Sequence, residues 1–410
     1  MGQPTALISG AGIAGCAVAY WLAAAGWRPT LVERAPQPRV GGYVIDFWGL
    51  GYDLSTKMGL GAAVEAAGYH VKEMSVADDQ GRTLARLDVK LLDALTAGRY
   101  VSLPRGDLAR LLLEAARPKA EMIFGDEIEI VSPTEDAVEV RLAGGGGGRF
   151  DLVIGADGLH SNLRRRMFGP DQRYERPLGY AVAVFEAEGY RPRDPDIYRI
   201  HSKPGRMVGR FTLRGDRTVF MFVFAHREAL PTDLAEQKAL LTETYRDDRW
   251  ELPEILGRLA ETETLYLDAV NQVVAPQWSK GRAVLLGDAA ACVSLLAGQG
   301  SALAMIAAYV LAGEIASARG DLPAALQRYE RRLRPLFEAK QAGAVRFAGA
   351  LAPRTPAGLW FRNQVIKLLA APGVARLVLG REILDPLTLP AYPELGPPRG
   401  GDGHAGSTTT

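Results

Sequence analysis

A glycine-rich stretch near the N-terminus has the residue types and the spacing of a phosphate-binding loop. It reads Gly10-x-Gly12-x-x-Gly15, and an acidic residue, Glu33, follows about 20 residues later. In such a loop Gly10 permits the tight turn, Gly12 lets the backbone approach a pyrophosphate, and Gly15 lets helix and strand pack closely. An acid placed like Glu33 accepts hydrogen bonds from ribose hydroxyls. The motif predicts a dinucleotide site and leaves open whether the ligand is NAD or FAD.

The elements around this loop are those that such a site needs. Residues 6–9 read as a short buried strand, residues 16–25 have helical spacing, and residues 29–32 form a second strand that ends at Glu33. The start of the helix offers unpaired N–H groups and a positive dipole end to phosphates. The alternative is a glycine-rich turn that binds no ligand. Strand, loop, helix, strand and acid in one register favour the dinucleotide site.

The composition is that of an ordinary globular protein. The chain has 410 residues, of which 48% are hydrophobic and 23% charged, and its net charge is +1. This length allows two domains, and the balanced charge gives no sign of a nucleic acid or a membrane as partner. Two cysteines, Cys16 and Cys292, suit a reducing compartment, so we expect a soluble cytoplasmic protein. The apolar run from Ser301 to Ala312 is too short to span a bilayer and is interrupted by Glu314.

The order of the elements predicts an α/β fold with two domains and a discontinuous chain path. The first, nucleotide-binding domain is expected to consist of residues 1–75, 98–177 and 276–345. The second is expected to consist of residues 76–97 and 178–275, where two-residue alternation predicts an antiparallel sheet. Residues 346–392 are expected to form a C-terminal helical segment, and residues 393–410 a disordered tail. A ligand is expected at the seam between the domains.

One predicted strand of the second domain, residues 218–224, separates its side chains by face. Phe220 and Phe222 fall on one face, and Met221 falls on the other. An aromatic face belongs to the core more often than to a substrate wall. Both interpretations stay open, and Phe220 and Phe222 are candidates for a substrate pocket.

Two further motifs follow the first in a fixed order. The second is Gly155-Ala-Asp-Gly-Leu-His-Ser-Asn-Leu-Arg164. The third is Gly287-Asp288 within residues 281–290, and it ends in Gly298-Gln-Gly300. Together the three resemble the single-component FAD-dependent aromatic hydroxylases, which are flavoprotein monooxygenases of the para-hydroxybenzoate hydroxylase type. The resemblance implies a Rossmann-like FAD-binding domain, a second antiparallel-sheet substrate domain and C-terminal helices.

The resemblance also implies roles for single residues. Glu33 would hold the adenosine ribose, Arg105 would reach the FAD phosphate or ribityl region, and Asp288 would accept hydrogen bonds from the ribityl chain. Asp157 would serve the FAD region and passing NAD(P)H, or would only cap its own turn. Arg34 is a phosphate contact or a solvated loop charge. The implied cofactor-binding residues are Gly10, Gly12, Ala14, Gly15, Glu33, Arg34, Gly42, Arg105, Asp157, Gly287, Asp288, Gly298 and Gly300.

A narrower resemblance concerns the pocket. Residues 39–49 and Asp268-Ala-x-x-Gln272 are similar to the branch that includes tetracycline-inactivating and polyketide-tailoring monooxygenases. Trp48 stands where that branch usually has arginine, which suggests a stacking wall, with a core position as the equal alternative. The family places prolines beside the reactive edge of the flavin, and this chain lacks them at Val293 and Leu295. Trp48 and Leu295 are further pocket candidates.

The function that the resemblance implies is a FAD-dependent monooxygenase that uses NAD(P)H. It would hydroxylate an aromatic or polyketide-like small molecule through a flavin C4a-hydroperoxide, in secondary metabolism or antibiotic modification, with FAD bound non-covalently. The five histidines show no ligand spacing, so no metal is expected, and no general base is identified.

Three alternatives remain. The missing prolines motivate a FAD-retaining, non-redox enzyme, such as a pericyclic cyclase of the Diels–Alder type in polyketide biosynthesis. The others are a protein that sequesters an antibiotic and a nicotinamide dehydrogenase. The substrate, the choice of NADH or NADPH, the monomeric or homodimeric state, and the fate of oxygen chemistry without the prolines stay open.

Overall fold

The nucleotide-binding part is built on a six-stranded sheet. The computed structural model describes residues 2–38, 42–369, 374 and 387–396. The strand order is β17-β18-β11-β1-β2-β7, all parallel except for β17. Their bounds are β1 Thr5–Ser9, β2 Arg28–Glu33, β7 Glu121–Phe124, β11 Leu152–Gly155, β17 Ser279–Lys280 and β18 Ala283–Leu285. The strands are rich in Val, Leu and Ile and are largely buried, as parallel strands covered by helices require.

Helices from distant parts of the chain form the core with this sheet. α1 packs against both α10 and α5, and α10 packs against α11. The bounds are α1 Ile13–Ala24, α5 Arg105–Ala116, α6 Asn162–Met167, α9 Asp288–Ala291, α10 Gly300–Ser317 and α11 Leu322–Leu351. α10 is long and apolar enough to cross a membrane, but 78% of it is buried inside the protein. Its apolarity is therefore accounted for by its central position in the core.

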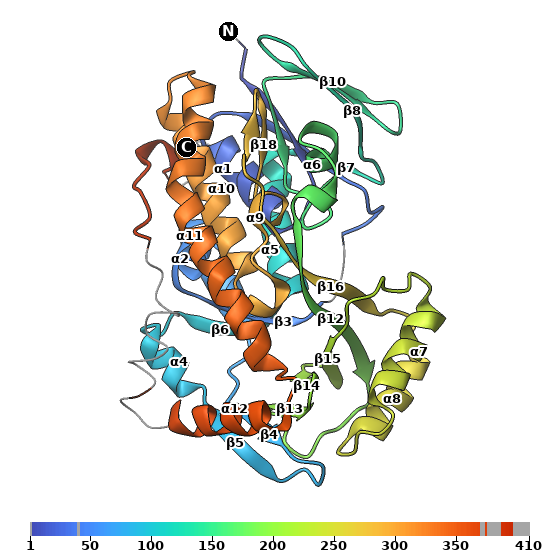
Figure 1. Cartoon of the computed structure of the whole chain (residues 1–410). Coiled ribbons are helices and arrows are strands. Elements are labelled where there is room, and N and C mark those ends of the chain that lie inside the picture. Colours follow the sequence, from blue (N-terminus) through green and yellow to red (C-terminus); the bar gives the residue numbers. More distant parts are fainter. Residues whose placement is uncertain (1, 39–41, 370–373, 375–386, 397–410) are drawn as a thin grey trace, which may run out of the picture.

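Two small sheets extend this part. A three-stranded sheet consists of β8 Ile128–Pro133, β9 Val138–Leu142 and β10 Gly147–Phe150, and a two-stranded ribbon of β3 Val44–Trp48 and β6 Tyr100–Pro104. The ribbon leads into α2 Gly49–Lys57 and α3 Gly61–Ala67. It lies between the six-stranded sheet and the second large sheet (Figure 1).

The second large sheet has seven strands in the order β16-β12-β15-β14-β13-β4-β5. All neighbours are antiparallel except β13 and β4. The bounds are β4 Glu73–Ala77, β5 Thr83–Asp88, β12 Glu175–Glu188, β13 Ile197–Lys203, β14 Arg206–Leu213, β15 Arg217–Ala225 and β16 Tyr266–Val273. β4 and β12 each cross a boundary expected from the sequence, at residues 75 and 177. The predicted fold class, an α/β protein with a second, antiparallel sheet, is confirmed.

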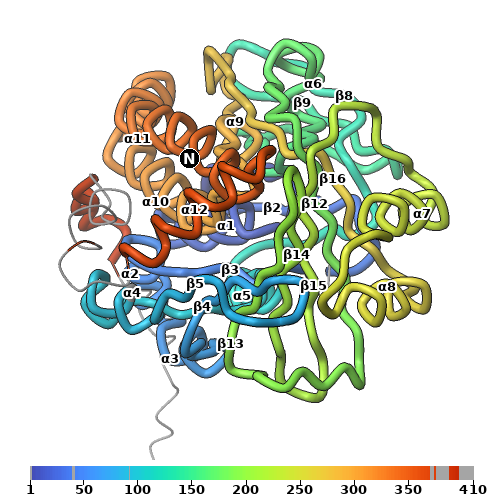
Figure 2. The backbone as a smooth tube through the Cα atoms, turned by 60° about the horizontal axis from the view of Figure 1, so that its bottom comes forward, coloured from blue at the N-terminus to red at the C-terminus, as the bar shows by residue number. Residues whose placement is uncertain are grey.

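Helices cover the second sheet in two places. α7 Leu234–Tyr245 and α8 Leu252–Glu261 lie side by side near one edge, and α12 Pro356–Leu369 packs on β5 at the other (Figure 2). The remaining short helices are α4 Lys90–Leu95, η1 Arg117–Lys119, η2 Asp171–Arg173, η3 Leu295–Ala297 and η4 Pro393–Leu395.

The prediction of a disordered tail from residue 393 is wrong for residues 393–396. They contain η4, and Leu395 is fully buried in the main core. Just before it, the ring of Tyr392 lies on α10 where Gly313 has no side chain, and its hydroxyl donates to Glu314 at 2.7 Å. Residues 397–410 and most of the expected helical stretch after residue 369 lie outside the described residues.

Gly313→Ala is expected to destabilise the protein, because the new Cβ would lie 2.1 Å from the Tyr392 ring. Displacing that buried ring costs about 2 kcal/mol of unfolding free energy, more than the helix gains from alanine. Denaturant unfolding measures the change. Gly349→Ala in α11 is the matched control, since nothing lies within 4 Å of its added Cβ. Equal stability of the two variants would contradict the packing argument.

Candidate active site

The parallel strands β1, β11 and β18 bring the three sequence motifs to one edge of the sheet. Ser9 is in register with Gly155, and Gly155 with Leu285. Each motif continues directly from the end of its strand, so the three turns lie next to one another. One cleft contacts all three, and the N-termini of α1 and α10 open into it. This cofactor cleft is lined by Gly12, Ile13, Ala14, Tyr43, Arg105, Ala156, Gly158, Asp288, Gly300, Ser301 and Ala304.

The three glycines of the first motif differ in what surrounds them. Gly10 has φ +98°, and a Cβ there would lie 2.7 Å from the carbonyl oxygen of Ala156. A Cβ on Gly15 would lie 1.9 Å from the carbonyl oxygen of Gly10. Gly12 lines the cleft, and nothing lies within 4 Å of its added Cβ. Gly10 and Gly15 therefore serve the turn and its packing, whereas Gly12 leaves room for a ligand, as a dinucleotide loop requires.

Glu33 lies beside this loop at the end of β2. Its Oε2 accepts a hydrogen bond from the backbone N–H of Ala11 at 3.0 Å, and its Oε1 accepts one from Ala35 at 2.9 Å. The carboxylate is thus held next to the start of α1, where a ribose attached to a loop-bound pyrophosphate would lie. Arg34 is exposed.

Asp157 acts mainly in its own turn. Its carboxylate accepts hydrogen bonds from Ser9 Oγ at 3.0 Å, from the backbone N–H of Leu163 at 3.0 Å and from Ser161 Oγ. Burial raises the pKa of the Asp157 carboxyl. The second motif lines the cleft through Ala156 and Gly158. This geometry favours the capping interpretation of Asp157 over direct contact with a ligand.

Arg164, at the end of the second motif, connects it to the third. Its side chain is fully buried and donates to the carbonyl oxygens of Leu159 at 2.7 Å and Ala289 at 3.1 Å. It also pairs with Asp171 at 2.6 Å. Sequence reasoning did not assign Arg164 to the site, although it is the last residue of the recognised pattern. Its bond to Ala289 places the turn that carries Asp288.

The third motif places an acid at the cleft. Gly287 has φ +60° and fits between α1 and α10, since its added Cβ would lie 3.4 Å from Ala14 and 3.5 Å from Ala304. Asp288 is the first residue of α9 and lines the cleft. Burial raises the pKa of its carboxyl, and the positive charge of Arg105 opposes that shift. The structure therefore brings Asp288 and Arg105 together at the cleft.

Tyr43 is a cleft residue that sequence reasoning missed. Its carbonyl oxygen accepts a hydrogen bond from the backbone N–H of Arg105 at 3.0 Å, at the start of α5. Burial raises the pKa of its hydroxyl. Gly42, just before it, has φ +126°, and a Cβ added there would lie 3.8 Å from the Cβ of Arg105. The chain at Gly42 thus passes close to the start of α5, and the contact of Gly42 with FAD stays a prediction.

Two buried glutamines hold the loop that lacks the family's prolines. Gln272 donates through Nε2 to the carbonyl oxygens of Val293 and Gln341, both at 2.8 Å. Gln341 donates through Nε2 to the carbonyl oxygens of Val273 at 2.7 Å and Cys292 at 3.0 Å. This Gln272–Gln341 clamp joins β16, α11 and the loop. Gln272 belongs to a recognised pattern, whereas nothing local in the sequence marks Gln341.

The same loop carries an unusual backbone. Ser294 has φ +142° and is buried, and its Oγ accepts a hydrogen bond from the N–H of Leu296 at 3.2 Å. A residue with a side chain rarely adopts this conformation, which costs of the order of 1–3 kcal/mol. Proline at this position is excluded because its φ is fixed near −65°. Gly298, with φ +66°, then turns the chain into Gly300 at the cleft.

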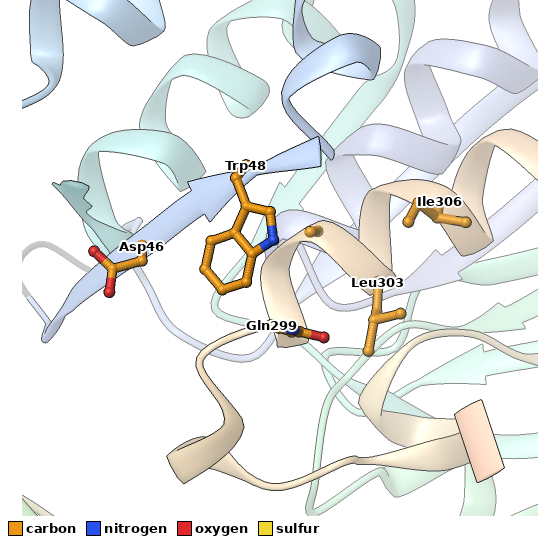
Figure 3. A pocket seen from close by; sticks show the side chains of 6 residues that line it. Asp46, Trp48, Gln299, Leu303 and Ile306 are labelled. Carbon is orange, nitrogen blue, oxygen red and sulfur yellow. The ribbon is translucent and has the colours of Figure 1, made fainter. Parts of the chain in front are cut away.

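An apolar cluster of side chains lies next to this loop. We call it the seam; it joins one face of the second sheet to Tyr43, Val44 at the start of β3, and Leu295 and Leu296 of the loop. Leu295 packs there with Met221 from the second sheet, and its role in a substrate pocket stays a prediction. Trp48 is partly buried and projects from β3 toward the start of α10, near Gln299 and Leu303 (Figure 3).

The prediction of Phe220 and Phe222 as pocket residues is wrong. Both lie on the other face of the second sheet, where they are completely buried in one cluster with residues of α7 and α8 such as Leu241 and Ile255. Met221 is the residue of this strand that faces the seam. The alternation was predicted correctly, but the aromatic face forms core.

Comparisons with known proteins agree with this geometry. Residues 3–342 match the family described as FAD binding domain. The chain is 35% identical to a flavin-dependent monooxygenase from an unknown prokaryotic organism, over 83% of this chain and 88% of that protein. It is 34% identical to an uncharacterised protein of Mycobacterium tuberculosis, over 82% and 91% of the two chains.

A solved structure is similar over nearly the whole chain. The tetracycline destructase Tet(55) superposes with a TM-score of 0.80 at 30% identity, covering 95% of this chain and 99% of that one. The three converging motifs and these similarities lead to one conclusion: the chain belongs to the FAD-binding family and is a flavin-dependent monooxygenase.

Proposed function

We propose that the protein uses NAD(P)H to hydroxylate an aromatic or polyketide-like small molecule, in secondary metabolism or antibiotic modification. The observation that carries this proposal is the junction of the cofactor cleft with the apolar seam at residues 293–300. Similarity to a tetracycline destructase supports a polycyclic substrate. We further propose that it acts in the cytoplasm, which its two free, buried cysteines support.

The cleft residues divide the binding of FAD among them. Gly12 and the N-terminus of α1 would hold the pyrophosphate, and Glu33 the adenosine ribose. Arg105 and Asp288 would hold the phosphate and ribityl region. Gly298 and Gly300 would bring backbone N–H groups to the flavin end. Bound FAD, once reduced by NAD(P)H, supplies the activation of oxygen.

The seam supplies the apolar surroundings that oxygen transfer requires. Its side chains include Tyr180, Met207, Phe211, Met221 and Leu295. Such side chains exclude water from the space beside the flavin end of the cleft. The route of oxygen transfer expected from the family resemblance stays a prediction. A pericyclic cyclase on this scaffold is not favoured, because a relative that is 35% identical is named a flavin-dependent monooxygenase.

The proposed reaction is tested by turnover. The purified protein with FAD should oxidise NADPH or NADH at least about tenfold faster when an accepted polycyclic phenol is added. One atom of oxygen-18 from labelled O2 should enter the product, as measured by mass spectrometry. Conversion of substrate without nicotinamide or oxygen would contradict the proposal and support the non-redox alternative.

Gly12→Ala should lose FAD and keep its fold. The added methyl group meets no atom within 4 Å, so the free energy of unfolding without cofactor should stay nearly unchanged. It points into the path of the pyrophosphate, so FAD affinity should fall by about tenfold or more. Fluorescence titration of the apoprotein with FAD measures this.

Gly26→Ala is the matched control, since Gly26 follows α1 outside the cleft and its added Cβ also meets nothing within 4 Å. Because Gly26 has φ +85°, alanine is more strained in Gly26→Ala than in Gly12→Ala. Unchanged FAD affinity in Gly12→Ala would refute the assignment of the cleft.

Gln272→Leu should uncouple the loop from β16 and α11. The carbonyl oxygens of Val293 and Gln341 would lose their donor, which lowers the free energy of unfolding by about 2 kcal/mol. FAD should still bind, while the fraction of oxidised NADPH that yields product should fall. Gln237→Leu, which removes a 3.0 Å bond to Pro231 before α7, is the control. If the fraction of oxidised NADPH that yields product were equal in both variants, a positioning role for Gln272 would be excluded.

A further inference from the structure

The β3–β6 ribbon presents a polar face to the seam. Side chains alternate along β3, so Ile45 and Phe47 are buried in the main core while Asp46 and Trp48 lie on the other side. Asp46 is paired in register with Ser102 of β6. Val44, on the same side of β3 as Asp46, packs in the seam, so an acidic residue stands beside an apolar cluster.

Two hydroxyl groups hold the Asp46 carboxylate in one orientation. Tyr100 Oη donates to Oδ1 at 2.6 Å, and Ser102 Oγ donates to the same oxygen at 2.7 Å. The two hydroxyls also lie 3.1 Å from each other. Both bonds end on Oδ1, so within the described part of the chain Oδ2 keeps its capacity to accept hydrogen bonds.

The charge of Asp46 has no cationic partner among the described residues. By contrast Asp53, on the neighbouring α2, pairs with Arg99 at 2.8 Å. Across the seam, burial raises the pKa of Tyr198, and the negative charge of Asp46 raises it further. A partly buried carboxylate that has no counter-ion is unfavourable, and a cationic ligand group would stabilise it.

Asp46 and Trp48 line one pocket with the start of α10. The other lining residues are Gln299, Ala302, Leu303 and Ile306, and the indole of Trp48 points toward that helix (Figure 3). Gln299 is the middle residue of the Gly298-Gln-Gly300 turn, and the next residue, Gly300, lines the cofactor cleft. The pocket therefore adjoins the flavin end of the cleft. An indole face favours flat rings and cations alike.

We propose that Asp46 and Trp48 form a substrate subsite for a protonated amine carried by a flat, apolar ring system. The ammonium group would donate to Oδ2 of Asp46, and the ring next to it would lie against Trp48. Tyr100 and Ser102 are positioning residues, since they orient the carboxylate. This subsite rests on the proposed function, for which it names the substrate class.

The test is equilibrium binding to the FAD-loaded enzyme, followed by calorimetry and by the change in the flavin spectrum. The probes are amine-bearing aromatics, each paired with a counterpart that lacks only the amine: doxycycline with 4-dedimethylamino doxycycline, and tyramine with 4-ethylphenol. At least one amine should bind with about tenfold or higher affinity than its counterpart. Asp46→Asn should remove that preference and change the affinity of the counterpart by less than about twofold.

Asp53→Asn is the matched control and should leave both affinities unchanged, while Asp46→Glu should keep part of the preference. Equal binding within every pair, failure of every amine to bind, or an equal loss for both members in Asp46→Asn would overturn the subsite. These outcomes are separate from those for turnover. An amine preference that depends on Asp46 in a protein without NADPH oxidation would keep the subsite and reject the proposed reaction.

Discussion

The cofactor cleft depends on the parallel register of β1, β11 and β18. That register places the residues after each strand next to one another at one edge of the sheet. The turns then approach so closely that Gly10 has no room for a side chain against Ala156. Arg164 fixes the remaining turn by donating to Ala289. The backbone segments of these turns thus contact one another directly and form the cleft. They can approach this closely only where the residue is glycine, so the positions of the glycines determine the shape of the cleft.

The second sheet makes the site complete by adding an apolar wall. One of its faces is covered by α7 and α8, and the other closes the seam opposite the β3–β6 ribbon. Between cleft and seam runs the loop of residues 293–298, which the Gln272–Gln341 clamp ties to both domains. The absence of prolines in this loop is accompanied by a positive φ at Ser294. Hydrogen bonds from Gln272 and Gln341, which lie far away in the sequence, hold this loop although the backbone conformation at Ser294 is unfavourable by itself.

The errors of the sequence interpretation share one cause. Alternation in residues 218–224 separated Phe220 from Met221 correctly, but which face meets helices is decided by α7 and α8, which come later in the chain. The tail was expected to be disordered from its composition, yet Tyr392 finds a flat site on α10 because residue 313 is glycine. The sequence also left the role of Trp48 open, because an aromatic residue in a strand gives the same alternation whether it lines a pocket or lies in the core.

The sequence by itself determined the nucleotide loop, its acid and the three motifs, because the steric demands of a tight turn and a close phosphate act within a few residues. It also determined the two kinds of sheet, since side-chain periodicity is a local property. The tertiary structure alone decided the role of Asp157 in its turn, the bond from Arg164 to Ala289, the partner of Gln272 and the exposure of Asp46 to the seam. Arg164 and Ala289 are 125 positions apart, and Gln272 and Gln341 are 69 apart. Contacts over such separations depend on how whole elements pack, which no local pattern encodes.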